Sequence, residues 1–291
     1  MPSGRLSLSH ALVLGLLQGP TELLPISSSA HTVLIPWLAG WPDAELDPDL
    51  RKSFEVVLHV GAGVALAVDM RAELTQAAIN LDGRQAAVIA LSLAPPAIAG
   101  FTLQRFIEHR LGGPRSIAAG LIAGAIAMAL ADSRGSTGER PAAATRGRAS
   151  AGPCDGLALG LAQAAALIPG VSRNGATLSA ARARGFSRAD AETLSWQAAL
   201  PVILGASALK GRQLARAELP PGTGRALMVG GGAAFLSTLA SARLLRRERG
   251  SGRSLLPCSI YRCLLAATVL RRLRDRSTAN VKGIQDWERL A

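Results

Sequence analysis

Two stretches of the chain place polar residues and helix breakers inside sequence that is otherwise apolar. The first reads LGLLQGPTELLPISSSAH from Leu14 to His31, and the second reads LGLAQAAALIPGVSRNGAT from Leu159 to Thr177. Proline stops an α-helix because it lacks a backbone N–H and its ring clashes with the preceding turn. The apolar pieces on either side are too short to cross about 30 Å of hydrocarbon. Irregular backbone at membrane depth must be buried in protein or line a cavity, so we expect two re-entrant helix–loop–helix pairs whose polar tips meet.

The composition is that of a protein that crosses a membrane several times. Of the 291 residues, 49% are hydrophobic and 18% are charged, and the charges are bunched between long apolar runs. Such a pattern is typical of a polytopic membrane protein. The net charge of +12 raises the question of nucleic acid, but aromatic residues make up only 3% of the chain. Because no zinc-finger or basic-helix pattern is present either, we assign the arginines to the membrane flanks and expect no nucleic-acid partner.

Six segments are apolar and long enough to predict spanning helices. They are Phe54 to Met70, Ala86 to Leu103, Ser116 to Ala131, Ala191 to Leu209, Ala226 to Leu245 and Leu255 to Leu270. Residues 133–152 read as a polar, flexible linker, and residues 271–291 as a polar tail. We therefore expect a single membrane domain over residues 1–291, with one half at residues 6–132 and the other at residues 153–270.

The two halves resemble each other in sequence. Leu14 to Gln18 matches Leu159 to Gln163, and Pro25 and Ser28 match Pro169 and Ser172 in a P-x-x-S pattern. Further on, Ser-Phe-Glu at residues 53–55 matches Ser-Trp-Gln at residues 195–197. Each half then contains one re-entrant pair and three spans, and an odd number of spans turns the second half upside down relative to the first. The predicted fold is an all-α polytopic integral membrane protein made of two inverted repeats.

The expected meeting point carries the chemistry of phosphoryl transfer. Gln18 and Glu22 are four residues apart and so share one helix face, where Glu22 can serve as a base or, with Gln18, hold a divalent cation. The planar fork of Arg173 suits phosphate oxygens. Ser27 to Ser29 offer nucleophilic or phosphate-binding hydroxyls, and His31 offers a titratable imidazole. A cation and backbone amides match a multiply charged oxyanion, which favours phosphoryl hydrolysis over acyl transfer.

Other interpretations of these residues stay open. A serine triplet ahead of a helix commonly serves only to cap it, and Glu55, His59 and Gln197 fit helix packing as well as a place in the site. Inverted repeats with broken helices also suit a transporter or flippase of lipid phosphates, and a structural membrane subunit is a third possibility. The set of Ser28, His31 and Glu22, a nucleophile with its activators, favours the enzyme because a carrier does not need one.

The motifs resemble those of the undecaprenyl-diphosphate phosphatase family, also called the bacitracin-resistance protein family, of bacterial membranes. Its first pattern, a Glu or Gln four residues before a Glu and then LPxSSxxH, is present as Gln18, Glu22, Leu24, Pro25, Ser27, Ser28 and His31. Its second pattern, PGxSRSxxT, is present as Pro169, Gly170, Ser172, Arg173 and Thr177, with Asn174 in place of the usual serine. The similarity extends roughly from Leu6 to Leu270, which is most of the chain.

The resemblance implies removal of the terminal phosphate from a C55 polyprenyl diphosphate lipid, which yields the monophosphate carrier for cell-wall synthesis and gives bacitracin resistance. It also implies dependence on Mg²⁺ or Ca²⁺, a place among the lipids of the bacterial inner membrane, a site that opens to the outer face, and a homodimer as one oligomeric state. Carried over to this chain, Glu22 and Gln18 belong to the cation or base cluster. Ser28 is the expected nucleophile, activated by His31 or Glu22, with direct attack by water as the alternative. Arg173 is expected to bind the diphosphate, and the surrounding substrate-binding residues are Ser27, Ser172, Asn174 and Thr177.

Overall fold

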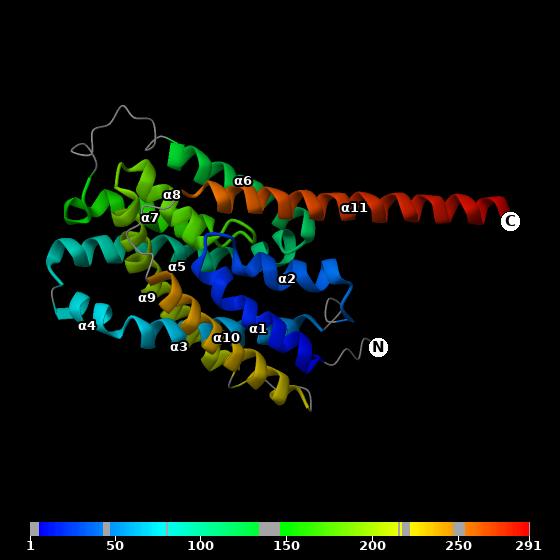
Figure 1. The fold of residues 1–291 in the computed structure, drawn as a ribbon, viewed down its shortest axis with the longest axis horizontal. Helices are drawn as coiled ribbons and strands as arrows, with labels where there is room; N and C mark the ends of the chain where they lie inside the picture. The colour runs from blue at the N-terminus through cyan, green and yellow to red at the C-terminus, as the bar shows by residue number, and fades with distance from the viewer. Residues whose placement is uncertain are drawn as a thin grey trace.

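The computed structural model describes residues 6–42, 47–79, 81–133, 146–214, 216, 222–246 and 254–290. In these residues the regular structure is helical, and the helices pack side by side in a bundle from which the end of the last helix projects (Figure 1). In chain order they are α1 (Leu8–Leu23), α2 (Ser28–Ala39), α3 (Pro48–Asp69), α4 (Arg71–Ile79), α5 (Gly83–Leu111), α6 (Pro114–Ser133), a 3-10 turn (Arg148–Ser150), α7 (Pro153–Ala165), α8 (Arg173–Ala183), α9 (Arg188–Leu214), α10 (Thr223–Arg246) and α11 (Leu256–Leu290).

The two expected helix–loop–helix pairs are present as α1–α2 and α7–α8. Their helices contain 16, 12, 13 and 11 residues. At about 1.5 Å per residue, none of them reaches the roughly 30 Å that a hydrocarbon core requires. The sequence therefore predicted both hairpins, because each has a breaker between two short apolar pieces.

The turns of the two hairpins have the same unusual backbone. Ser27 begins α2 with φ 77°, and Ser172 begins α8 with φ 66°; among the described non-glycine residues only these two have positive φ. Ser27 and Ser172 stand as far apart in the chain as Gly15 and Gly160, so the register that relates the helices continues through the turns. The structure therefore pairs Ser28 with Arg173. The P-x-x-S match of Ser28 with Ser172 was wrong by one residue, because three consecutive serines allowed a pairing that the backbone does not follow.

Helix contacts in one half have counterparts in the other. α1 packs on α10 as α7 packs on α5, while α3 contacts α9 and α6 contacts α11. Glycine permits the closest of these approaches, because a Cβ on Gly15 would lie 2.5 Å from the carbonyl oxygen of Gly230. Gly160 faces the Leu91 carbonyl in the same way. This exchange of contacts is what two related repeats would produce, and their inverted orientation stays a prediction.

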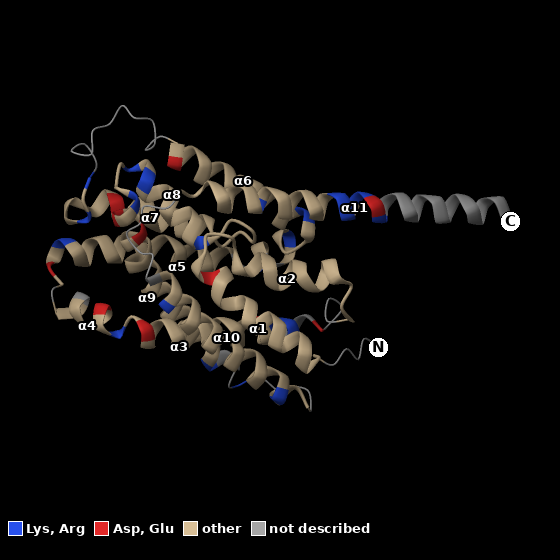
Figure 2. Ribbon diagram, in the orientation of Figure 1, with Lys and Arg blue, Asp and Glu red and all other residues tan. Residues whose placement is uncertain are grey.

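Three helical segments are long and apolar enough to cross a membrane, namely Gly83–Leu103, Pro114–Ser133 and Thr223–Leu245. The first shows apolar side chains to the surroundings, with Phe101 82% and Ile98 64% exposed. The other three predicted spans fall almost entirely within α3, α9 and α11, and their passage through a membrane stays a prediction. Most charged residues lie near helix ends (Figure 2). The bundle is therefore that of an all-α, membrane-embedded protein.

Two connecting segments differ from their predicted character. The predicted linker lies partly outside the described residues, but its last part is anchored, because the Arg146 guanidinium donates to Asp155 Oδ1 at 2.9 Å and Oδ2 at 2.7 Å. These hydrogen bonds to Asp155 raise the pKa of Arg146. The predicted polar tail continues α11 to Leu290 instead of forming a separate segment.

The contact between α1 and α10 can be tested at its glycine. We expect Gly15→Ala to lower the stability of the detergent-solubilised protein by about 1–3 kcal/mol, because the new methyl group collides with the Gly230 carbonyl. Gly232→Ala, on α10 where a Cβ would meet nothing within 4 Å, should leave stability unchanged or slightly raised. Thermal unfolding of both variants provides the measurement, and equal midpoints would contradict the packing.

Candidate functional site

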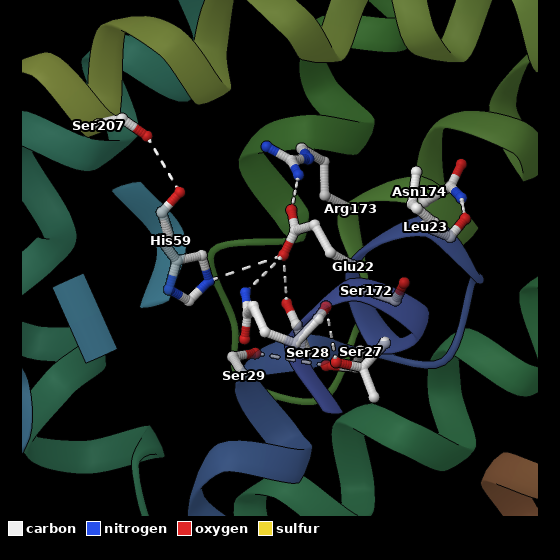
Figure 3. A network of polar contacts seen from close by, with 12 residues as sticks. Glu22, Leu23, Ser27, Ser28, Ser29, His59, Ser172, Arg173, Asn174 and Ser207 are labelled. Carbon is white, nitrogen blue, oxygen red and sulfur yellow. Dashed lines mark hydrogen bonds and ion pairs between the residues drawn. The ribbon is translucent and has the colours of Figure 1, made fainter. Parts of the chain in front are cut away.

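The site is centred on Glu22, a carboxylate in the last turn of α1 whose side chain is only 5% exposed. Its Oε1 accepts a hydrogen bond from Nη2 of Arg173. Its Oε2 accepts one from Ser28 Oγ at 2.7 Å and one from Gln18 Nε2 at 3.2 Å. Figure 3 shows these groups converging from α1, α2 and α8. The two hairpins therefore meet at one buried carboxylate.

Ser28 and Arg173 owe their positions to the two serine caps. Each is the first residue of its helix, directly after a serine with positive φ, and the two helices are α2 and α8. Such a backbone costs about 1–3 kcal/mol and persists only where its surroundings enforce it. Helix N-termini also carry partial positive charge. A hydroxyl, a guanidinium and two helix N-termini thus lie beside Glu22, which is a suitable arrangement for a phosphate group.

His31 faces away from this centre. Its Nδ1 lies 2.7 Å from the carbonyl oxygen of Ser27, and its Nε2 lies 2.7 Å from the hydroxyl of Tyr261 on α11. The His31 and Tyr261 rings are stacked with centroids 5.7 Å apart. Both ring nitrogens are therefore engaged away from Ser28, and the expected activation of Ser28 by His31 has no contact in this geometry. Glu22 occupies the position of the base instead.

His59 on α3 is the imidazole that does approach Glu22. Its Nε2 lies 3.8 Å from Glu22 Oε2, and its Nδ1 donates to the carbonyl oxygen of Glu55 at 2.8 Å (Figure 3). The open question about His59 is thereby answered in favour of the site. Gln197, which was considered together with it, is exposed on α9.

Three of the expected substrate-binding residues hold the second turn together. Ser172 Oγ accepts a hydrogen bond from the backbone N–H of Gly175 at 3.2 Å. Asn174 Nδ2 donates to the carbonyl oxygen of Leu23 at 2.6 Å and so joins the two hairpins. Thr177 is fully buried, and its hydroxyl donates to the Arg173 carbonyl at 2.9 Å.

The remaining predicted residues lie close to Glu22. Ser27 Oγ is 3.3 Å from Ser29 Oγ. Gln18 is 1% exposed, and its Oε1 has no partner among the described residues. No group of three or more His, Cys, Asp or Glu side chains suited to a metal ion occurs in the described part of the chain. Any cation must therefore use Glu22, the Gln18 amide and ligands from outside the protein.

Arg262 and Tyr261 are the residues that sequence reasoning missed. Arg262 on α11 is fully buried, and its guanidinium donates to the carbonyl oxygens of Pro25, Gly170 and Val171 in the two turns. A signal was present, because an arginine inside an apolar stretch is costly unless it has a role. The stretch that contains it, Leu255 to Leu270, was interpreted only as a span.

A helical membrane protein with two broken-helix hairpins that bring a carboxylate, a hydroxyl and a guanidinium together belongs to the class of integral membrane proteins with an anion-handling centre. The family model described as "Bacitracin resistance protein BacA" matches residues 11–268, and the chain belongs to this family. An undecaprenyl-diphosphatase of Geobacter sulfurreducens is 40% identical over 286 residues, 93% of this chain and 100% of the relative. That of Geobacter metallireducens is 39% identical over 277 residues, 90% and 96% of the two chains. That of Myxococcus xanthus is 32% identical over 297 residues, 97% and 95% of the two chains.

The pairing of Glu22 with Arg173 predicts non-additive stability. Arg173→Met should cost about 3–5 kcal/mol, because it leaves a buried carboxylate without its cation. The double variant Glu22→Gln with Arg173→Met should cost less than the sum of the single variants by about 0.5–3 kcal/mol. Thermal unfolding of the four proteins in detergent measures this coupling.

The matched control combines Glu22→Gln with Arg188→Met. Arg188 belongs to a separate ion pair, with its Nε 2.8 Å from Asp132 Oδ1. The effects of these two substitutions should add. Additive effects in the Glu22 and Arg173 cycle as well would contradict the site described above.

Proposed function

We propose that this protein hydrolyses undecaprenyl diphosphate to undecaprenyl phosphate and inorganic phosphate. The family and the names of its relatives support this substrate. The observation that carries the chemistry is the 2.7 Å hydrogen bond from Ser28 Oγ to the Glu22 carboxylate, beside the Arg173 guanidinium. The activity recycles the lipid carrier for peptidoglycan synthesis and accounts for bacitracin resistance.

The reaction begins with proton transfer from Ser28 to Glu22. Glu22 Oε2 takes the hydroxyl proton while Ser28 Oγ attacks the terminal phosphorus, and the bond from that phosphorus to the bridging oxygen breaks. Undecaprenyl phosphate leaves with the bridging oxygen. Water then attacks the phosphoserine, gives its proton to the base, and releases inorganic phosphate. In the alternative, Glu22 activates water directly and Ser28 only binds the phosphate.

Arg173 has two partners in succession in this account. Its side chain is 22% exposed, whereas that of Glu22 is 5% exposed, so an incoming diphosphate reaches the guanidinium first. Phosphate oxygens then replace the carboxylate as its partner. Glu22 loses its strongest cation at that moment, becomes more basic, and is better able to accept the Ser28 proton.

The residues around Glu22 fit a divalent cation, although they provide few ligands. The buried Gln18 amide lies 3.2 Å from Glu22 Oε2 through its nitrogen, and its Oε1 lacks a partner in the described residues. Exchanging the amide nitrogen and oxygen would present two oxygen ligands, which Mg²⁺ and Ca²⁺ prefer, and Mg²⁺ commonly takes its remaining ligands from substrate phosphates and water. A bound cation would supply charge neutralisation of the diphosphate.

The Ser28 and Glu22 pair also separates this function from transport. A carrier or flippase of lipid phosphates needs a cation such as Arg173 but no hydroxyl bonded to a buried carboxylate. The family resemblance supports a location in the bacterial inner membrane, with the site open to the outer face. It likewise supports a homodimer as the oligomeric state to be tested.

Removing the Ser28 hydroxyl tests the proposed reaction. We expect Ser28→Ala to reduce phosphate release from a long-chain polyprenyl diphosphate by about 10³-fold or more, because the nucleophile is lost. The neighbouring exposed Ser29 provides the matched control, and Ser29→Ala should stay within a few-fold of wild type. A phosphate adduct on Ser28, detected by mass spectrometry after rapid quenching, would identify the serine route. Full activity in Ser28→Ala would reject the serine route and leave direct attack by water.

The Gln18 amide gives a test of the cation site. Gln18→Glu should lower the Mg²⁺ or Ca²⁺ concentration required for half-maximal activity by about tenfold, because a second carboxylate joins Glu22. Gln18→Leu should raise it. Gln76→Glu, on the exposed surface of α4, serves as the control for added charge alone. The same cation dependence in all three variants would place the cation elsewhere.

A further inference from the structure

Arg262 occupies the place where both hairpin turns contact α11. Its side chain is 0% exposed. Nη1 donates to the carbonyl oxygen of Pro25 at 3.3 Å, in the first turn. Nη2 donates to the carbonyl oxygens of Gly170 at 2.8 Å and Val171 at 2.9 Å, in the second. One guanidinium therefore bonds to both turns at once.

The bonded carbonyls immediately precede the residues that form the site. Pro25 lies two residues before the cap Ser27, and Val171 lies directly before the cap Ser172. Each cap has positive φ and directs the next side chain, Ser28 or Arg173, toward Glu22. A shift of either turn relative to the other would therefore separate these side chains from the carboxylate.

The surrounding helices are shaped to accept this guanidinium. On α6, a Cβ at Gly124 would collide with it, and on α8 a Cβ at Gly175 would lie 2.9 Å from Nη1. The partners that the structure gives Arg262 are carbonyl oxygens and the Met128 sulfur, with no carboxylate among the described contacts. A buried charge without a counter-ion is costly, so its retention here indicates a role that a neutral side chain would not fill.

The residue before it makes a second tie to the same turn. The Tyr261 hydroxyl is 2.7 Å from His31 Nε2, and His31 Nδ1 is 2.7 Å from the Ser27 carbonyl oxygen. Two consecutive residues of α11 thus fix the backbone on both sides of Ser27. Because Arg262 is fully buried and its printed contacts are with the turns and α6, it acts through these turns and does not touch substrate.

We propose that Arg262 is a positioning residue, whose simultaneous bonds to the two turns keep Ser28 and Arg173 in register around Glu22. The proposal rests on the proposed function for its kinetic part only. Its structural part, the register between the hairpins, can be measured without any activity.

The experiment compares Arg262→Lys and Arg262→Met with Asp132→Asn. Asp132 also ties α6 to α11, through hydrogen bonds to Ser254 Oγ at 2.8 Å and to the Leu255 N–H at 3.0 Å, but at the opposite end from the turns. For each folded variant, kcat and KM for phosphate release and the thermal midpoint are measured. We expect kcat to fall about 10²-fold in Arg262→Lys, more in Arg262→Met, with a smaller change in KM, because misplacement of reacting groups by about 1 Å has effects of this size. Asp132→Asn should lower the midpoint and leave kcat within a few-fold of wild type.

The activity-independent readout is the coupling between Glu22→Gln and Arg173→Met in thermal unfolding, repeated in the Arg262→Lys background. We expect this coupling to fall by at least half. If Arg262→Lys does not fold, Gly124→Ala displaces the guanidinium without removing it and should give the same two results in the same directions. Wild-type kcat or an unchanged coupling in the folded variant would overturn the positioning role. An inactive wild type would reject the proposed function, while the coupling would still decide the role of Arg262.

Discussion

The structure depends on a carboxylate that must be charged and buried at once. Removing a carboxylate from water costs several kcal/mol unless cations and hydrogen-bond donors replace the solvent. Glu22 obtains its guanidinium from the other half of the chain, since Arg173 is 151 residues away. The two hairpins must therefore meet tip to tip, and the glycines that let α1 and α7 lie against their neighbours permit that approach.

The two halves divide the chemistry between equivalent positions. Each begins a helix directly after a serine cap with positive φ, but the first half places the hydroxyl of Ser28 there and the second places the guanidinium of Arg173. A duplicated turn has thus acquired a nucleophile in one copy and a phosphate-binding cation in the other. Asn174, where the family pattern has serine, reaches across to the Leu23 carbonyl and adds a bond between the halves.

Sequence reasoning predicted the hairpins, the helical class and the main polar residues, because breakers and charges inside apolar sequence have few physical explanations. It did not predict which imidazole meets Glu22. His31 is close in sequence, but its ring turns to Tyr261, which is 230 residues away, whereas His59 approaches from α3. Arg262 was missed for the same reason, since its contact with Pro25 spans 237 residues and no local pattern encodes it.

The central claim is that Ser28, Glu22 and Arg173 surround the terminal phosphate. It is tested most directly by an experimental structure in lipid with a polyprenyl diphosphonate, in which a methylene group replaces the bridging oxygen. We expect the terminal phosphorus about 3–3.5 Å from Ser28 Oγ, the methylene group on the opposite side of that phosphorus, and Arg173 bonded to the phosphonate oxygens instead of Glu22. A diphosphonate bound away from Ser28, with Arg173 still paired to Glu22, would contradict the account.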